Sequence, residues 1–209
     1  MEQYYGLREL PSFDVTVHHG TTTDELTELL EASGNFFHYI GHVTDDGIRC
    51  TDGHLDVGTL QEVNVTAFLL NACSSYAQGT ALVDRGSCGG IVTLSRVGNT
   101  VGTSIGHALS RLLRSGFSLR SSLSVVHRHF LTGYRYVVIG DGALTLCQSE
   151  SGVLFTLGVE SANSDTFEIT SLAYPGQFSK PGTMDQLTVT ESSTHYLSPG
   201  PLPTIEIST

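Results

Sequence analysis

The sequence predicts an α/β fold built on a mostly parallel sheet. Short apolar stretches typical of buried strands alternate with segments that carry the i, i+3, i+4 apolar spacing of amphipathic helices. Residues 65–73 are almost continuously apolar, as expected of a central strand covered on both faces. After residue 147, short β-like pieces separated by Ser, Asn, Gly and Pro replace the alternation. We therefore expect a three-layer α/β/α domain over residues 1–147 and a short β-rich extension over 148–209.

The elements follow from local patterns along the chain. A helix is expected after Thr23 as its N-cap, because Asp24 and Glu25 suit a first turn and Leu26, Leu29 and Leu30 form one apolar stripe. Turn signals flank a hairpin over residues 44–57. Further helices are expected over 80–84, 100–115 and 118–131. The expected strands are residues 13–18, 36–41, 65–72, 90–95 and 136–139, with another over 144–147.

Charge and composition limit the possible partners. The 209 residues carry 21 acidic and 10 basic side chains, a formal net charge of −11, and a single lysine. An acidic surface repels a polyanion, so we expect no nucleic-acid partner. The sequence has no apolar run long enough to span a membrane and no signal-peptide pattern, so we expect a cytoplasmic protein. The acidic, lysine-poor and Ser/Thr-rich composition is typical of a halophile such as a haloarchaeon, in which surface carboxylates keep proteins hydrated in salt.

Two chemically useful residues follow two of the predicted strands. His42 comes directly after the strand over 36–41, and Cys73 ends the apolar run over 65–73. The carboxyl ends of parallel strands meet at one edge of a sheet, where ligands bind. If these strands are neighbours, the imidazole of His42 is placed to activate the Cys73 thiol as a nucleophile.

The sequence segments around His42 and Cys73 resemble the two active-site motifs of CHAT domains. These domains are caspase-like cysteine peptidases related to separase, gingipain and the caspases. The blocks are His38-Tyr39-Ile40-Gly41-His42 and Leu70-Asn71-Ala72-Cys73. Weaker likenesses are Gly89-Gly90-Ile91-Val92 for the next strand and Gly140-Asp141-Gly142 for a late segment. The resemblance covers residues 13–147 and implies a caspase-like three-layer sandwich.

The resemblance also implies a role for particular residues. Cys73 would be the nucleophile and His42 the general base of a cysteine endopeptidase. The backbone N–H groups of Val43 and Cys73 would form the oxyanion hole, with His38 and Asn71 supporting the site. The implied partner is a protein or peptide substrate, and no metal or organic cofactor is needed. Candidates for substrate binding are Arg96, Asn99 and Asp46. Arg96 would suit an acidic substrate residue and Asp46 a basic one, although both are also ordinary surface residues.

Two departures from the family keep a second function open. The family has Gly after the catalytic His where this chain has Val43, which removes left-handed backbone freedom at the oxyanion hole. Residues 13–18 resemble the second strand of the family, so its first strand is missing or vestigial. The exposed sheet edge would then need an upstream segment or a protein partner to cover it. The alternative function is therefore a catalytically silent caspase-like module that binds partners. A third possibility is a zinc hydrolase that uses His38, His42 and His54.

Overall fold

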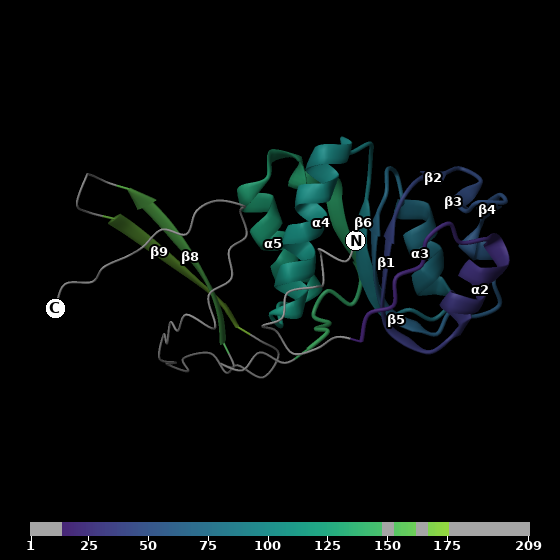
Figure 1. The fold of residues 1–209 in the computed structure, drawn as a ribbon. Helices are drawn as coiled ribbons and strands as arrows, with labels where there is room; N and C mark the ends of the chain where they lie inside the picture. Colours follow the sequence, from purple (N-terminus) through teal and green to yellow (C-terminus); the bar gives the residue numbers. More distant parts are fainter. Residues whose placement is uncertain (1–13, 148–152, 162–166, 176–209) are drawn as a thin grey trace.

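The structure is a computed structural model that describes residues 14–147, 153–161 and 167–175. A four-stranded sheet lies at the centre of the described chain, with helices on both of its faces (Figure 1). The order across the sheet is β1-β5-β6-β7, and these strands are Gly34–Ile40, Val65–Asn71, Gly89–Thr93 and Tyr136–Gly140. The pairs β1–β5 and β5–β6 are parallel, whereas β7 runs antiparallel to β6. The predicted α/β class with a mostly parallel sheet is therefore confirmed.

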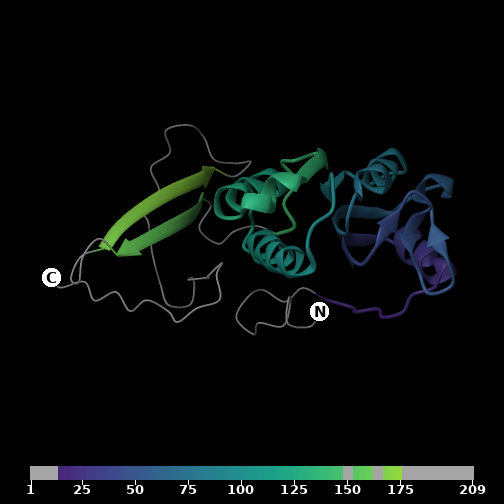
Figure 2. The same cartoon turned by 90° about the horizontal axis from the view of Figure 1, so that it is seen from above.

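Two separate hydrophobic cores cover the two faces of the sheet. On one face, Phe68 and Leu70 of β5 pack with Leu26 and Leu30 of helix α2 (Thr23–Glu31) and with Leu82 of helix α3 (Tyr76–Asp84). On the other face, Leu69 and Ile91 pack against helices α4 (Asn99–Arg114) and α5 (Leu119–His129). Because successive side chains of a strand point to opposite faces, the continuous apolar run of β5 supplies both cores. Figures 1 and 2 show the resulting three layers.

The helices begin where the sequence provides caps. Thr22, one residue before the predicted cap, forms a capping box with Glu25 at the start of α2. The Ser118 side chain accepts from the Ser121 N–H at the start of α5. Helix α3 is longer than the predicted helix over 80–84, because it begins directly after Ser75. The remaining helical pieces are the 3₁₀ turns η1 (Val57–Thr59) and η2 (Leu131–Arg135).

Two smaller antiparallel sheets accompany the central one. The predicted hairpin region forms a three-stranded sheet of β2 (Val43–Thr44), β3 (Gly47–Arg49) and β4 (His54–Leu55). In the predicted extension, β8 (Val153–Ser161) and β9 (Phe167–Pro175) pair as a hairpin. The ring of Tyr174 from β9 lies 5.3 Å from that of Phe117. Residues 148–152, 162–166 and 176–209 fall outside the described residues, so a separate domain over 148–209 stays a prediction.

The strand predicted over residues 13–18 is wrong for the residues that the structure describes. Residues 14–18 have no regular secondary structure, and Figure 2 shows them as a purple coil that leads into α2. Val15 is 42% exposed, so the alternating pattern buries no apolar face. Phe13 lies outside the described residues. Within the described ranges, no strand pairs with the outer edge of β1.

The strand predicted over 144–147 is also absent. Leu144 and Leu146 pack against the core that contains α5, and the Leu144 carbonyl accepts the N–H of Leu119 at 3.0 Å. These apolar residues are therefore partly buried against a helical core, and they show the spacing of a strand although no strand pairs with them.

Candidate functional site

His42 and Cys73 extend from two adjacent parallel strands in the same register. Ile40 of β1 pairs with Asn71 of β5. His42 and Cys73 each follow their member of this pair by two residues. Neighbouring strands lie about 4.8 Å apart, so the chain leaves the sheet at closely spaced points on one edge. The predicted adjacency of the two strands is confirmed, and both residues lie at the carboxyl edge where parallel sheets bind ligands.

The backbone turns sharply directly after Cys73. Ser74 has φ 53°, the only positive φ of a non-glycine residue within the described part of the chain. The left-handed region costs a residue with a side chain about 1–2 kcal/mol. The buried Ser75 hydroxyl, which donates to Leu70 O at 3.0 Å and accepts from Thr93 N–H at 3.0 Å, holds this turn in place. Helix α3 follows at once. The left-handed residue therefore lies directly after Cys73, where the chain turns from the end of β5 into α3.

The Cys73 sulfur contacts the loop between β6 and α4. It accepts the backbone N–H of Val97 at 3.4 Å and lies 3.6 Å from the Val97 carbonyl oxygen. The side chain is half-buried, which leaves part of the thiol open to solvent. The contact therefore holds the sulfur beside the loop that carries Arg96 and leads into α4 at Asn99, and it leaves part of the thiol exposed.

The backbone of His42 is held by the Tyr39 hydroxyl. The His42 N–H donates to this hydroxyl at 3.1 Å, and the hydroxyl lies 3.0 Å from both His42 O and Arg49 O. Burial raises the pKa of Tyr39, so the hydroxyl keeps its proton at neutral pH. A Cβ at Gly41 would lie 2.3 Å from the Tyr39 oxygen, so this arrangement requires glycine there. His42 itself is exposed to solvent.

The backbone N–H of Val43 is not used in the small sheet. The N–H of Arg49 donates to His42 O at 2.9 Å, which makes His42 and Arg49 a hydrogen-bonded pair. The next pair, Val43 and Ile48, is then a non-hydrogen-bonded pair, so the Val43 N–H points away from β3. The φ of Val43 is not in the left-handed region. A glycine is therefore not required at this position of the structure.

His38 is a core residue on the face of the sheet that α4 covers. Burial, and to a smaller extent the nearby His107 of α4, lower its pKa to about 3. The residue as a whole keeps some solvent exposure, whereas its Nε2 atom is inaccessible. Desolvation of the ring nitrogens sets the pKa of a histidine, so the pKa is lowered despite this exposure. His38 is therefore neutral at physiological pH.

Asn71 connects three elements just before the turn at Cys73. Its Nδ2 donates to Gly102 O of α4 at 3.0 Å, and its Oδ1 accepts from the Tyr136 hydroxyl at 2.6 Å. These bonds fix the end of β5 relative to α4 and β7. Asn71 thus ties the end of β5 to two other elements, and its part in a catalytic site stays a prediction.

The three candidates for substrate binding lie at the same sheet edge. Arg96 lies in the loop between β6 and α4, Asn99 is the first residue of α4, and Asp46 lies in the turn between β2 and β3. All three residues are exposed. The carbonyl of Arg96 accepts a hydrogen bond from the Arg135 guanidinium, which anchors this loop to the start of β7.

The zinc alternative loses its support in the part of the chain that is described. No three His, Cys, Asp or Glu side chains gather there closely enough to hold a metal ion. His38 is turned toward the α4 core, whereas His42 and His54 are exposed.

In the described part of the chain, no helix has both the length and the apolar character needed to cross a membrane.

Comparison with known proteins finds similarity among solved structures. No protein-family model and no curated protein matches the sequence. Among solved structures, the chain is similar to the complex of the pro- and mature domains of RgpB from Porphyromonas gingivalis, with a TM-score of 0.48 and 14% sequence identity. The match covers 74% of this chain and 44% of that chain, so it spans less than half of the neighbour's length. Membership of the CHAT family therefore stays a prediction.

Proposed function

We propose that this protein is a caspase-like cysteine peptidase in which Cys73 is the nucleophile and His42 the general base. The observation that carries the proposal is the shared register of the two residues beyond the Ile40–Asn71 pair of adjacent parallel strands. The left-handed turn at Ser74 adds to it, because strain of this kind is retained where a side chain must be presented.

In the proposed reaction, His42 removes the proton of the Cys73 thiol, and the sulfur attacks the carbonyl carbon of the scissile peptide bond. The N–H groups of Val43 and Cys73 stabilise the resulting oxyanion. The imidazolium of His42 then protonates the leaving amine as the C–N bond breaks, which leaves a thioester on Cys73. A water molecule, deprotonated by His42, hydrolyses the thioester and restores the thiol. The outward Val43 N–H supports its assigned part in this reaction.

The test is turnover of a peptide library by the full chain, at both low and high salt, with Cys73→Ala as the inactive variant. Cys50→Ala is the matched control, because Cys50 is also half-buried and burial raises the pKa of its thiol. We expect Cys73→Ala to abolish cleavage and Cys50→Ala to leave it unchanged. Cleavage that survives Cys73→Ala refutes the proposal. Activity that increases with salt would support the proposed halophilic origin.

A second function, a silent module that binds proteins, is favoured by one observation. The outer edge of β1 pairs with no strand in the described ranges, and an open edge is a template for another chain. Native mass spectrometry separates the two functions. A stable hetero-complex without turnover would support the silent module, whereas turnover by the isolated chain would exclude it.

A further inference from the structure

Two fully buried hydroxyl side chains, those of Ser75 and Thr93, lie beneath the turn that follows Cys73. Ser75 precedes helix α3, and Thr93 is the last residue of β6. The Ser75 hydroxyl donates to Leu70 O at 3.0 Å, and the Thr93 hydroxyl donates to Ala72 O. Because a hydroxyl has a single proton, both protons are used on carbonyl groups at the end of β5.

The oxygen atoms of the two hydroxyls accept hydrogen bonds in a reciprocal way. The Ser75 hydroxyl accepts the backbone N–H of Thr93 at 3.0 Å, and the Thr93 hydroxyl accepts the backbone N–H of Ser75 at 3.4 Å. The two oxygens lie 3.3 Å apart. Loss of either hydroxyl therefore takes the partner from one buried carbonyl and from one buried N–H.

The Thr93 hydroxyl fixes the direction of the peptide bond between Ala72 and Cys73. Because Thr93 belongs to β6, the Ala72 carbonyl points toward β6. A trans peptide is planar with its N–H opposite to its C=O, so the Cys73 N–H points the other way. In the order β1-β5-β6-β7, the other neighbour of β5 is β1. The Cys73 N–H is therefore turned toward the side on which β1 continues into His42 and Val43.

The backbone of β5 agrees with this direction. Thr66 O accepts the N–H of Cys88, the residue before β6, at 2.8 Å. Four residues further along, Leu70 O faces the buried hydroxyl pair on the same side. Alternate residues of a strand direct their backbone groups to the same neighbour, so Ala72 continues the pattern of Thr66 and Leu70. Thr93 thus maintains the direction of the backbone beyond Asn71, where β5 has ended.

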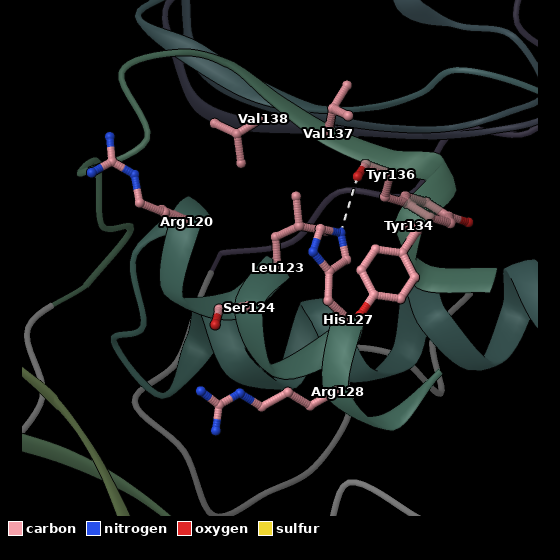
Figure 3. Close-up of a pocket in the computed structure, with 9 residues that line it drawn as sticks. All are labelled: Arg120, Leu123, Ser124, His127, Arg128, Tyr134, Tyr136, Val137 and Val138. Carbon is pink, nitrogen blue, oxygen red and sulfur yellow. Dashed lines mark hydrogen bonds between the residues drawn. The ribbon is translucent and has the colours of Figure 1, made fainter. Parts of the chain in front are cut away.

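Thr93 is itself held from its other side. It pairs with Tyr136, the first residue of β7. The Tyr136 carbonyl accepts a hydrogen bond from Nε2 of His127 in α5 at 3.2 Å, which is drawn in Figure 3. The Tyr136 hydroxyl donates to Oδ1 of Asn71 at 2.6 Å. Together with the branched Cβ of threonine, which restricts the side-chain rotamer, these contacts limit the movement of the Thr93 hydroxyl.

We propose that Thr93 is a positioning residue of the proposed peptidase, whose hydroxyl holds the Ala72–Cys73 peptide so that the Cys73 N–H is directed at the oxyanion. This inference rests on the proposed function and adds a residue to it. Without the hydroxyl, Ser75 N–H and Ala72 O would bond each other directly, as in an ordinary four-residue turn, and the Cys73 N–H would rotate. The N–H acts on charge that develops in the transition state, so its rotation slows the chemical step rather than weakening substrate binding.

The test compares Thr93→Val, which keeps the shape of the side chain but not the hydroxyl, with Thr93→Ser, which keeps the hydroxyl. Ser87→Ala is the matched control, because Ser87 is buried and its hydroxyl donates to Val65 O at 2.8 Å, at the other end of β5. Ser75→Ala is a second variant, which is read alone if Thr93→Val does not fold. All variants are made in the full chain, and melting curves show which of them fold.

Three measurements separate the direction of the Cys73 N–H from a general structural effect. The first is kcat and KM on a peptide that the parent cleaves. The second is binding of the C-terminal aldehyde of the same peptide: the sulfur of Cys73 bonds to the aldehyde carbon, and the oxygen, which takes the thiol proton, occupies the place of the oxyanion. The third is alkylation of Cys73 by iodoacetamide, in which the sulfur displaces iodide and no oxyanion forms.

We expect Thr93→Val to lower kcat and to weaken aldehyde binding by about tenfold to a hundredfold each, because the donor is misdirected rather than removed. The KM and the alkylation rate should stay within about twofold of the parent. Thr93→Ser should restore most of both losses, and Ser75→Ala should give a smaller fall of the same kind. Ser87→Ala should lower the melting temperature alone.

Three results would overturn the inference. Parent-like kcat and aldehyde binding in whichever of Thr93→Val and Ser75→Ala folds would mean that the hydroxyls do not direct the N–H. An equal fall in the alkylation rate, or an equal loss of kcat in Ser87→Ala, would mean that the whole turn is disturbed. A parent that neither cleaves peptides nor binds the aldehyde would refute the proposed function as well. An active parent with an unchanged Thr93→Val variant would instead refute this inference alone.

Discussion

A buried neutral histidine at the centre of β1 makes the stability of this protein depend on pH. His38 points to the α4 core, where burial and His107 lower its pKa to about 3 from an ordinary value of 6.5. In the unfolded chain the ring is in water and binds a proton as the pH falls through 6.5. The folded chain binds that proton only near pH 3. Folding stability is therefore complete above pH 6.5 and is lost progressively between pH 6.5 and about 3.

The size of the loss follows from linkage between protonation and folding. At pH 5.0 the unfolded histidine is almost fully protonated and the folded one is neutral, which costs about 2 kcal/mol of folding free energy. The figure holds for any folded pKa below about 4, because the folded state is then still neutral at pH 5.0. A loss of this size is a large fraction of the stability of an ordinary domain, about 5–15 kcal/mol.

The assay is urea unfolding at pH 7.5 and pH 5.0, followed by far-UV circular dichroism because the chain has no tryptophan. The comparison is between the parent and His38→Gln, which removes the titrating group. His54→Gln is the control, because His54 is exposed. We expect the parent and His54→Gln to lose about 2 kcal/mol more than His38→Gln between the two pH values. Other titrating groups contribute equally to both proteins and cancel in the difference.

Equal losses in the parent and in His38→Gln would refute this reasoning. They would mean that His38 binds its proton in the folded state as it does in water, and hence that β1 does not bury it against α4. The assignment of His38 to a structural part would then also fail.

Three further predictions concern single positions near the candidate site and in the core. Gly41→Ala places a Cβ 2.3 Å from the Tyr39 hydroxyl oxygen, so we expect peptidase activity to fall at least tenfold, and Tyr39→Phe to give a smaller fall; equal activity of parent and Gly41→Ala would contradict this. Gly90→Ala meets the Phe68 ring at 2.4 Å and should cost about 1–3 kcal/mol by urea unfolding. The cost should shrink when Phe68→Leu is combined with it, and an unchanged cost would argue against the contact. Ser74→Gly relieves the left-handed turn and should raise the melting temperature by about 2–4 °C; a lower melting temperature would argue against strain at Ser74.

The strands and helices that carry strong local patterns are the ones the sequence predicts well. The apolar run of β5 and the amphipathic spacing of α4 are local properties, and both elements lie within a residue or two of the expected bounds. The strand over 13–18 failed because alternation does not say whether a partner strand is available. The start of α3 was missed because Gly79 is a poor helix former. In the structure, a Cβ at position 79 would lie 2.3 Å from Cγ1 of Val92, so the close packing of α3 on β6 favours glycine at this position of the helix.

In the candidate site, too, features that follow from local patterns are predictable and contacts between distant residues are not. That His42 and Cys73 follow adjacent strands was predictable from where two apolar runs end. The contacts that support these two residues could not be predicted, because each contact joins residues far apart in the sequence and no local pattern shows that they meet. Val97 meets the Cys73 sulfur across 24 positions, and the left-handed Ser74 is a non-glycine residue without a turn signal of its own. The one usable signal is Gly41, since a glycine beside a functional residue often marks a close approach.

Net charge is a further property that an average over the chain describes poorly. Charges separated by more than about 8 Å are screened from one another at physiological ionic strength, so a ligand responds to the charges close to its binding site. A total of −11 therefore opposes a long polyanion that covers much of the surface, but it does not describe residues 85–140, which carry seven arginines and no carboxylate. At the candidate catalytic edge both signs of charge are present, because Asp45 and Asp46 follow His42 and Arg96 precedes Val97, which contacts the Cys73 sulfur. The net charge of the chain therefore does not decide whether this edge prefers an acidic or a basic substrate residue.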